Sequence, residues 1–377
     1  MILSEAQRMV RDTAREFARS RIAPHTRQWE ADGAFPREVL AEMGGLGFLG
    51  MTVPETLGGA GLDYVSYALA LMEIAAADGA LSTLMSVNNA PVCAILTACG
   101  STRQQQEYLR PLAAGEMIGA FALTEPQAGS DAANLRTSAR RVDDAYVLNG
   151  TKQFITSGAI AGVTITFAVT DPAAGKKGLT AFLVPAGTAG FRVGRLETKL
   201  GQRASDTAQL VYEDARVEAW LRIGNEGDGY RIALANLETG RIGIAAQSVG
   251  MAAAALEHAL AYARDRQAFG KPLTEHQAVA FRLADMATEV EAARQLVLHA
   301  AALKDAGEPC LTEACMAKLF ASEHAERVAS AAVQVLGGYG YVEDYLVEKI
   351  YRDVRVCQIY EGTSDIQRLI IGRELAR

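Results

Sequence analysis

The fold is decided by the stretch VTITFAV at residues 163–169 and by its neighbour LTAFLV at residues 179–184. Short apolar runs of this length, separated by Gly, Pro, Asn and Asp, are typical of strands. Three more runs of the same kind surround them: Ile118–Leu123, Tyr146–Leu148 and Ala208–Tyr212. The pairs Asp143-Asp144 and Asn149-Gly150 are turn signals. We therefore predict a central antiparallel β domain over residues 117–226.

On the N-terminal side of this region the pattern is helical. Ser4 and Gln7 have the spacing of a capping box, and apolar residues follow at helical spacing until Pro24 closes the helix. A second capping box, Ser101 with Gln104, predicts a helix that ends near Pro111. The expected unit is an N-terminal helical domain over residues 1–116.

On the C-terminal side long helical patterns return, rich in Ala and Leu. Four long helices with short connections predict a bundle over residues 227–377. The longest apolar stretch, Ile242–Leu256, is interrupted by Gln247 and Ser248, so it indicates a helix buried in the bundle and not a membrane span. The predicted fold class is thus an α+β multidomain protein with an N-terminal helical domain, a central antiparallel β domain and a C-terminal four-helix bundle.

The composition limits the kinds of partner. The 377 residues carry a net charge of −7 with a pI of about 5.4, which argues against nucleic acid or an anionic membrane surface. A phosphorylated ligand can still be recognised by local Arg and backbone N–H groups. The five cysteines form no Cys-x-x-Cys pair and the five histidines show no zinc-ligand spacing, so we expect buried, reduced cysteines and no metal.

The N-terminus lacks the pattern of a signal peptide. We therefore expect no membrane insertion, and either a bacterial-type cytoplasmic protein or the mature form of a mitochondrial matrix protein.

One glycine motif has a familiar spacing. Gly45-x-Gly47-x-x-Gly50 matches the dinucleotide-binding fingerprint, but the preceding Arg37–Met43 has a helical pattern and no strand leads into it. We interpret these glycines as structural turn residues and predict no Rossmann site.

Two loops at the ends of predicted strands carry polar groups that can meet a ligand. Phe121–Asp131 offers Thr, Ser and Gly, and Lys152–Gly158 places an aromatic ring beside hydroxyls. Taken alone, each is more simply explained as an ordinary Pro/Gly turn or as a core Phe.

Three C-terminal segments also have two explanations. Arg266-x-x-Phe269-Gly270 follows a long helix, and the glycines of Gln334–Gly340 either cap a helix or bring the backbone close to a phosphate. Glu361 lies among apolar neighbours and next to Gly362, which is typical either of a surface Glu or of a partly desolvated base with a raised pKa.

Together these segments resemble the acyl-CoA dehydrogenase family across essentially the whole chain, and most closely its short-chain, butyryl-CoA type. The resemblance rests on Leu123-Thr124-Glu125-Pro126, Gly129-Ser130-Asp131, Arg266-x-x-Phe269-Gly270, Gln334-x-x-Gly337-Gly338, Tyr360-Glu361-Gly362-Thr363-Ser364 and Met85-Ser86-Val87-Asn88-Asn89.

The resemblance implies FAD as cofactor, bound between the β domain and the C-terminal bundle. The residues implied in FAD binding are Phe121, Ala122, Leu123, Thr124, Gly129, Ser130, Phe154, Ile155, Thr156, Arg266, Phe269, Gln277, Gln334, Val335, Leu336, Gly337, Gly338, Thr363, Ser364 and Asp365. Of these, Arg266, Gln277 and Gln334–Gly338 would hold the FAD of a neighbouring subunit. The site would then need at least a dimer, and the family is usually a homotetramer, a dimer of dimers.

The resemblance also implies the substrate and the chemistry. Ser130, Glu238, Thr239, Gly240, Arg241 and Gly362 would contact the acyl-CoA. Glu361 would remove the α-proton of a short to medium straight-chain acyl-CoA, FAD would accept the β-hydride, and an electron-transfer flavoprotein would receive the electrons. The base position used by the isovaleryl and long-chain branches corresponds to residue 240, which is glycine here.

Two points of this interpretation stay open at the level of sequence. Many relatives carry Trp where this chain has Phe154, which leaves the flavin potential undetermined. The alternatives are a short branched-chain or dicarboxylyl-CoA dehydrogenase, a flavin oxidase or monooxygenase on the same fold, and a non-catalytic acyl-CoA-binding protein.

Overall fold

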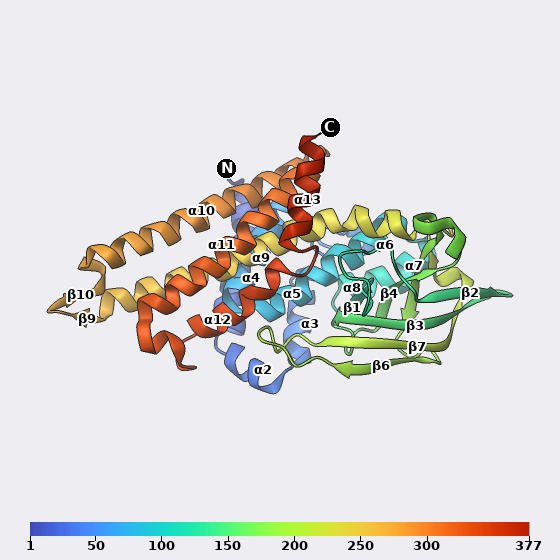
Figure 1. The fold of residues 1–377 in the computed structure, drawn as a ribbon, viewed down its shortest axis with the longest axis horizontal. Coiled ribbons are helices and arrows are strands. Elements are labelled where there is room, and N and C mark those ends of the chain that lie inside the picture. The colour runs from blue at the N-terminus through green and yellow to red at the C-terminus, as the bar shows by residue number, and fades with distance from the viewer. Residues whose placement is uncertain (377) are drawn as a thin grey trace.

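A computed structural model describes residues 1–376 of the chain. Helices at both ends of the sequence enclose a sheet formed by its middle part (Figure 1). The helices are α1 (Glu5–Phe17), α2 (Thr26–Asp32), α3 (Arg37–Gly45), α4 (Tyr64–Ala77), α5 (Gly79–Val87), α6 (Ala94–Cys99), α7 (Thr102–Gln104), α8 (Arg110–Ala113), α9 (Gly229–Asp265), α10 (Gln277–Asp305), α11 (Leu311–Leu336), α12 (Val347–Val354) and α13 (Ser364–Leu375). The strands are β1 (Gly119–Ala122), β2 (Ser138–Val142), β3 (Ala145–Thr156), β4 (Val163–Val169), β5 (Leu179–Pro185), β6 (Phe191–Leu196), β7 (Thr207–Glu218), β8 (Arg222–Ile223), β9 (Gln267–Ala268) and β10 (Lys271–Pro272).

Both predicted capping boxes are present. Ser4 and Gln7 cap α1, and Ser101 and Gln104 cap α7. The helical segment that begins at α7 continues to Ala113, two residues after Pro111. The rejected glycine motif is structural as well, because a Cβ on Gly50 would lie 2.5 Å from the Cβ of Ala113. Gly50 therefore lets the turn after α3 pack directly against α8, and a Cβ on Gly47 would meet Ala60 at 3.1 Å.

The sheet has the strand order β6-β7-β3-β2-β4-β5-β8, with β1 pairing with β4. Most pairs are antiparallel, as expected, but β1 and β4 are parallel and so are β2 and β4 at their single contact. The sheet is therefore mainly antiparallel, with its parallel contacts at β4. Parallel neighbours need a long crossover connection, and the β2–β3 hairpin lies within the connection between β1 and β4.

Of the two predicted turns in this region, one is wrong. Asp143 forms the β2–β3 turn with a left-handed φ of +55°, as predicted. Asn149-Gly150 instead lies inside β3, where the register with β7 shifts. A Cβ on Gly150 would come within 2.5 Å of Thr137 Oγ1, so this glycine serves a close approach within the sheet.

The C-terminal part contains three long helices, α9, α10 and α11, where four were expected. After α11 the chain turns at Gly337, with φ +62°, and continues as the shorter α12 and α13. Helix α4 of the N-terminal part packs against both α9 and α10. In Figure 1 helix α9 extends from the sheet to the β9–β10 hairpin at the opposite end of the molecule.

Two apolar stretches lie in the core of the fold. Ile242–Leu256 forms part of α9 and is mostly buried, as predicted. Gly79–Cys99 is long and apolar enough to cross a membrane by length and composition, but 89% of its most apolar window is buried inside the fold. Burial of that kind is typical of a core helix.

Candidate active site

Glu361 lies in a short turn between the segment Arg355–Gln358 and helix α13. Its φ is +54° and that of Gly362 is +88°, so two consecutive residues are left-handed. Thr363 then caps α13 through its side chain, which accepts a hydrogen bond from the Ile366 N–H. Glu361 therefore lies outside both of the helical segments that flank it.

The Glu361 carboxylate is largely withdrawn from water. Its Oε2 atom is buried and has no hydrogen-bond partner among residues 1–376. Burial raises the pKa of Glu361 to about 7, although the positive charges of Arg241 and Lys318 act in the opposite direction. A carboxylate with this pKa is half ionised at neutral pH and a much stronger base than a solvated Glu.

Helix α9 faces this carboxylate with a glycine. A Cβ on Gly240 would lie 2.7 Å from Glu361 Oε2, so a larger residue there would collide with the base. Arg241 follows on α9, and its buried Nε has no partner among the described residues. The other two predicted substrate residues on this helix make internal contacts, Thr239 with the Asn236 carbonyl and Glu238 with Lys304.

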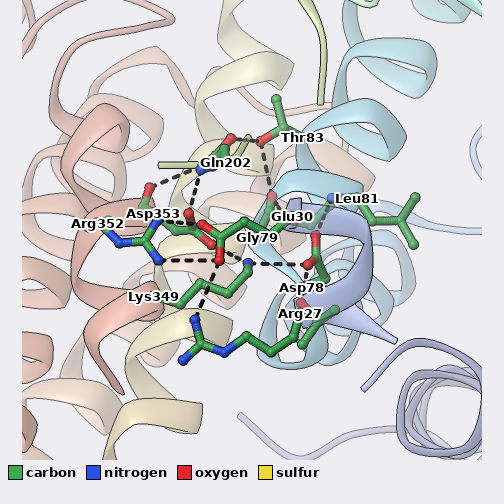
Figure 2. A network of polar contacts seen from close by, with 12 residues as sticks. Arg27, Glu30, Asp78, Gly79, Leu81, Thr83, Gln202, Lys349, Arg352 and Asp353 are labelled. Carbon is green, nitrogen blue, oxygen red and sulfur yellow. Dashed lines mark hydrogen bonds and ion pairs between the residues drawn. The ribbon is translucent and has the colours of Figure 1, made fainter. Parts of the chain in front are cut away.

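The residue before the base is anchored by a buried polar network. Tyr360 donates from its hydroxyl to Gln247 Oε1 at 2.6 Å, and Gln202 Nε2 lies 3.4 Å from the same hydroxyl. Figure 2 shows how Gln202 continues to Asp353, which pairs with Lys349 at 2.6 Å. Because these residues come from the sheet region and from α9 and α12, the base-bearing turn is tied to distant parts of the chain.

The two strand-end loops predicted from the sequence lie side by side. The Gln153 N–H donates to the Thr124 carbonyl at 2.9 Å, and Lys152 donates to the Leu123 carbonyl at 3.1 Å. Helix α5 packs against both β1 and β3, while its residue Thr83 contacts Tyr360. Helix α5 therefore connects these loops to the base-bearing turn.

A buried ion pair holds the two loops together. Lys152 Nζ lies 2.8 Å from Glu125 Oε1, and the carboxylate also accepts the N–H groups of Arg136 and Thr137. Burial alone would raise the pKa of Glu125, but Lys152 and these donors lower it to about 2. Burial lowers the pKa of Lys152 to about 8. Both groups are thus charged at pH 7.

Thr363, Ser364 and Asp365 lie directly after the base, but a second set of predicted cofactor residues lies far from it. Arg266, Phe269 and Gln277 are exposed near the β9–β10 hairpin, and Arg266 lies over the ring of Tyr339. From Gly240 to the end of α9 the helix rises roughly 40 Å at about 1.5 Å per residue. Within one chain the structure therefore does not bring this set together with Glu361.

Several contributors were not foreseen from the sequence. Lys318 and Gln367 are fully buried and bond the backbone of the Glu361 turn, and Gln202 and Asp353 support Tyr360. For Lys318 and Gln367 the only available signal was a polar residue among apolar ones in a helical pattern, and Gln202 and Asp353 gave none.

Three models of one protein family match the chain in sequence order. They are the acyl-CoA dehydrogenase N-terminal domain over residues 4–116, the middle domain over residues 120–215 and the C-terminal domain over residues 227–376. The chain belongs to the acyl-CoA dehydrogenase family. It is accordingly an oxidoreductase of the acyl-CoA dehydrogenase class, whose members are FAD flavoproteins.

Relatives within the acyl-CoA dehydrogenase family match the full chain. The mitochondrial short-chain specific acyl-CoA dehydrogenase of Mus musculus is 47% identical over 375 residues, covering 100% of this chain and 91% of the relative. Butyryl-CoA dehydrogenase from Megasphaera elsdenii has a TM-score of 0.97 at 41% identity, with 100% of each chain covered. A glutaryl-CoA dehydrogenase from Mycobacterium smegmatis in complex with FADH2 has a TM-score of 0.94 at 35% identity, covering 99% of this chain and 95% of that one.

The residues of this acyl-CoA dehydrogenase fit a bound flavin. Phe154 is 62% exposed beside the strand-end loops, although it is a large apolar ring. Buried hydroxyls of Ser157 and Ser364 lack partners among the described residues. Gly337 and Gly338 have open space where a Cβ would lie. The flat apolar side chain and the unpaired hydroxyls suit the isoalloxazine ring of FAD. The open glycine backbone suits its pyrophosphate.

Proposed function

We propose that this chain oxidises short, straight-chain acyl-CoA thioesters to trans-2-enoyl-CoA, with Glu361 as the base. The observation that carries the proposal is Glu361 Oε2, which is buried opposite Gly240 and has no partner among residues 1–376. Bound FAD supplies the hydride acceptor for the β-carbon. The proposed FAD contacts are the two strand-end loops and Ser364 in one subunit, and Arg266, Gln277 and Gln334–Gly338 of a neighbouring subunit.

Glu361 has two tasks in this proposal. Its carboxylate removes the α-proton, and its backbone N–H donates to the thioester oxygen as negative charge develops there. Among residues 1–376 no acceptor for this N–H is found, which supports its availability to a ligand. A donor directed at developing charge in a site with little water lowers the barrier strongly.

Arg241 and Lys318 favour the ionised form of the base. Both lie near Glu361 and lower its pKa against the effect of burial. The carboxylate is thereby kept available for proton removal near neutral pH, while exclusion of water keeps it basic.

Two observations support a short acyl chain. The matching relatives include a short-chain specific enzyme and a butyryl-CoA dehydrogenase. The fully buried Tyr67 also meets α9 at Gly243, one helical turn beyond Gly240, where a Cβ would lie 2.8 Å from the tyrosine hydroxyl. We infer that Tyr67 closes the space into which a longer tail would extend.

Two residues of the Met85–Asn89 segment, Asn88 and Asn89, support the fold. Asn88 donates to the carbonyls of Leu49 and Leu112 and accepts the N–H of Gly119, while Asn89 bonds the backbone of Phe48 and Met51. The contacts of these two asparagines therefore carry no argument about chain length, whereas Ser86 of the same segment bonds Tyr67 beside Gly243.

A dye-coupled assay over acyl-CoAs from C4 to C12, with isobutyryl-CoA included, tests the proposal. We expect catalytic efficiency to peak at butyryl- or hexanoyl-CoA and to fall for longer tails, with neighbouring lengths differing by about 10- to 200-fold at most. Efficiency still rising at dodecanoyl-CoA, or higher for isobutyryl-CoA, would contradict the short-chain assignment. Oxygen consumption with substrate alone would indicate an oxidase.

We propose an electron-transfer flavoprotein as the electron acceptor and a homotetramer as the assembly. The separation of the two sets of cofactor residues along α9 supports a site completed by a neighbouring subunit.

A further inference from the structure

The turn that carries Glu361 holds a backbone conformation that needs support. Glu361 has a φ of +54°, which residues other than glycine rarely adopt. Such a conformation persists where the surroundings fix it, and it is concentrated at functional sites.

Two fully buried side chains hold this turn. Lys318 on α11 donates from Nζ to the Gly362 carbonyl at 2.8 Å. Gln367 on α13 donates from Nε2 to the same carbonyl at 2.9 Å and to the Glu361 carbonyl at 3.2 Å. A Cβ on Gly362 would lie 2.8 Å from Gln367 Nε2, so the glycine also makes room for the second donor.

The value of φ at Glu361 decides whether its carboxylate and its backbone N–H can act on the same substrate molecule. Rotation about the N–Cα bond sets the angle between the N–H and the Cα–Cβ bond. The α-carbon and the thioester oxygen of one substrate are close together, so the carboxylate and the N–H must face the same small region. If the turn relaxed to a negative φ, one of the two groups would be directed away.

We propose that Lys318 and Gln367 are positioning residues that clamp the Glu361–Gly362 carbonyls, so that the Glu361 carboxylate and N–H act on the same thioester. This inference rests on the proposed function. Neither residue touches the reacting atoms. Both act through the backbone of the base, and Lys318 also acts on its pKa through its charge, which is why rates are compared at each protein's plateau pH.

The burial of Lys318 agrees with this role. An ammonium group enclosed by protein is costly unless it is paired or hydrogen-bonded, and Lys318 is placed with its Nζ on a backbone carbonyl. Burial lowers the pKa of Lys318 to about 8, with Cys357 and Glu361 acting in the opposite direction, so it remains mostly protonated at pH 7. The groups that face Glu361 are Lys318 from α11, Arg241 from α9 and the Tyr67 hydroxyl from α4.

The test uses the FAD-loaded enzyme with the substitution Lys318→Met, which keeps the length of the side chain and removes the donor. We expect kcat for butyryl-CoA, taken at the plateau pH of each protein, to fall about 10- to 100-fold. Loss of one oxyanion donor costs about 10²–10³-fold and sets the upper limit. FAD retention and the KM should change little.

A second readout does not depend on turnover. Crotonyl-CoA labelled with ¹³C at its carbonyl reports hydrogen bonding to the thioester oxygen through its infrared stretching frequency. We expect a clear downshift on binding to the wild type and a smaller one with Lys318→Met. Gln367→Met provides the same test through the other donor should Lys318→Met fail to fold.

Arg368→Met is the matched control. Arg368 joins the same two helices, α13 and α11, through an exposed pair with Glu323 at 2.7 Å, but does not bond the turn. It should keep the wild-type rate and the full carbonyl downshift.

The positioning proposal would be overturned if Lys318→Met and Gln367→Met fold, bind FAD and keep the wild-type kcat and carbonyl shift. That result would leave the proposed function intact. A wild-type enzyme that does not oxidise acyl-CoA would overturn the proposed function, and the clamp with it.

Discussion

Glu361 combines a buried carboxylate with a backbone N–H that has no acceptor among residues 1–376, and burial and neighbouring charges set the pKa of the carboxylate. Burial raises its pKa to about 7, so protonation below that pH removes the proposed base. We expect kcat/KM for butyryl-CoA to rise with pH along a limb with an apparent pKa near 7 and then to level off. A pH–rate profile in the dye-coupled assay measures this. A limb near the ordinary Glu value of about 4.3 would show that the base is solvated.

Gly240 is the second residue that controls the base. Ala in place of Gly normally stabilises a helix by about 1 kcal/mol, but here its Cβ would lie 2.7 Å from Glu361 Oε2. We expect Gly240→Ala to fold well and to lose roughly 10²-fold in kcat, the scale of a misplacement of about 1 Å.

Gly372→Ala on α13 is the control for Gly240→Ala, because beyond its own stretch of helix no atom of residues 1–376 lies within 4 Å of its added Cβ. If Gly240→Ala kept full activity, the carboxylate would have to act from a different position.

At the scale of elements, the Lys152–Glu125 pair joins the loop after β1 to the end of β3. Removing one partner of a buried pair costs about 3–5 kcal/mol, since it leaves an uncompensated charge. We expect Lys152→Met to lower the free energy of unfolding by that amount and to weaken FAD retention. Urea unfolding and release of FAD fluorescence on dilution measure the two effects.

The exposed pair Arg192–Glu213 between β6 and β7 is the matched control in the same sheet. Its loss should cost no more than about 1 kcal/mol and leave FAD binding unchanged. An equal effect of both substitutions would show that the buried pair has no special part in the flavin loops.

The helices and strands also show which features can be predicted from the sequence. Capping boxes and short apolar runs are local signals, and the helices and strands they predicted are present at Ser4, Ser101 and residues 163–169. Asn149-Gly150 misled because a glycine that permits close backbone approach looks the same in sequence as a turn glycine. Lys318 and Gln367 could not be assigned to the site, because their partners are set by the packing of α11 and α13 around the turn.

At the scale of the whole molecule, the network of Figure 2 joins its three parts. Asp78 caps α5, Gln202 lies between β6 and β7, and Lys349 and Asp353 belong to α12. Through Tyr360 the network ends beside the base. The position of Glu361 therefore depends on how the N-terminal helices, the sheet and the C-terminal helices fit together.

The C-terminal end of α9, next to Arg266, is the part of the chain proposed to join subunits through FAD. Arg266 is proposed to reach the FAD of a neighbouring subunit, and a ligand shared between subunits stabilises the assembly by mass action. Arg266→Ala should therefore weaken both FAD retention and the oligomer, measured by flavin content and by sedimentation over a range of concentrations. A fully active monomer at low concentration would contradict the shared site.

The central claim is that Glu361 removes the α-proton, and anaerobic mixing with butyryl-CoA tests it most directly. The bleaching of the flavin in a single turnover reports the chemical step without an electron acceptor. We predict that Glu361→Gln retains FAD and binds substrate but bleaches roughly 10²–10⁴-fold more slowly than the wild type, or slower still, the scale of a positioned general base. Bleaching within a few-fold of the wild-type rate would contradict the account, because another group would then be taking the proton.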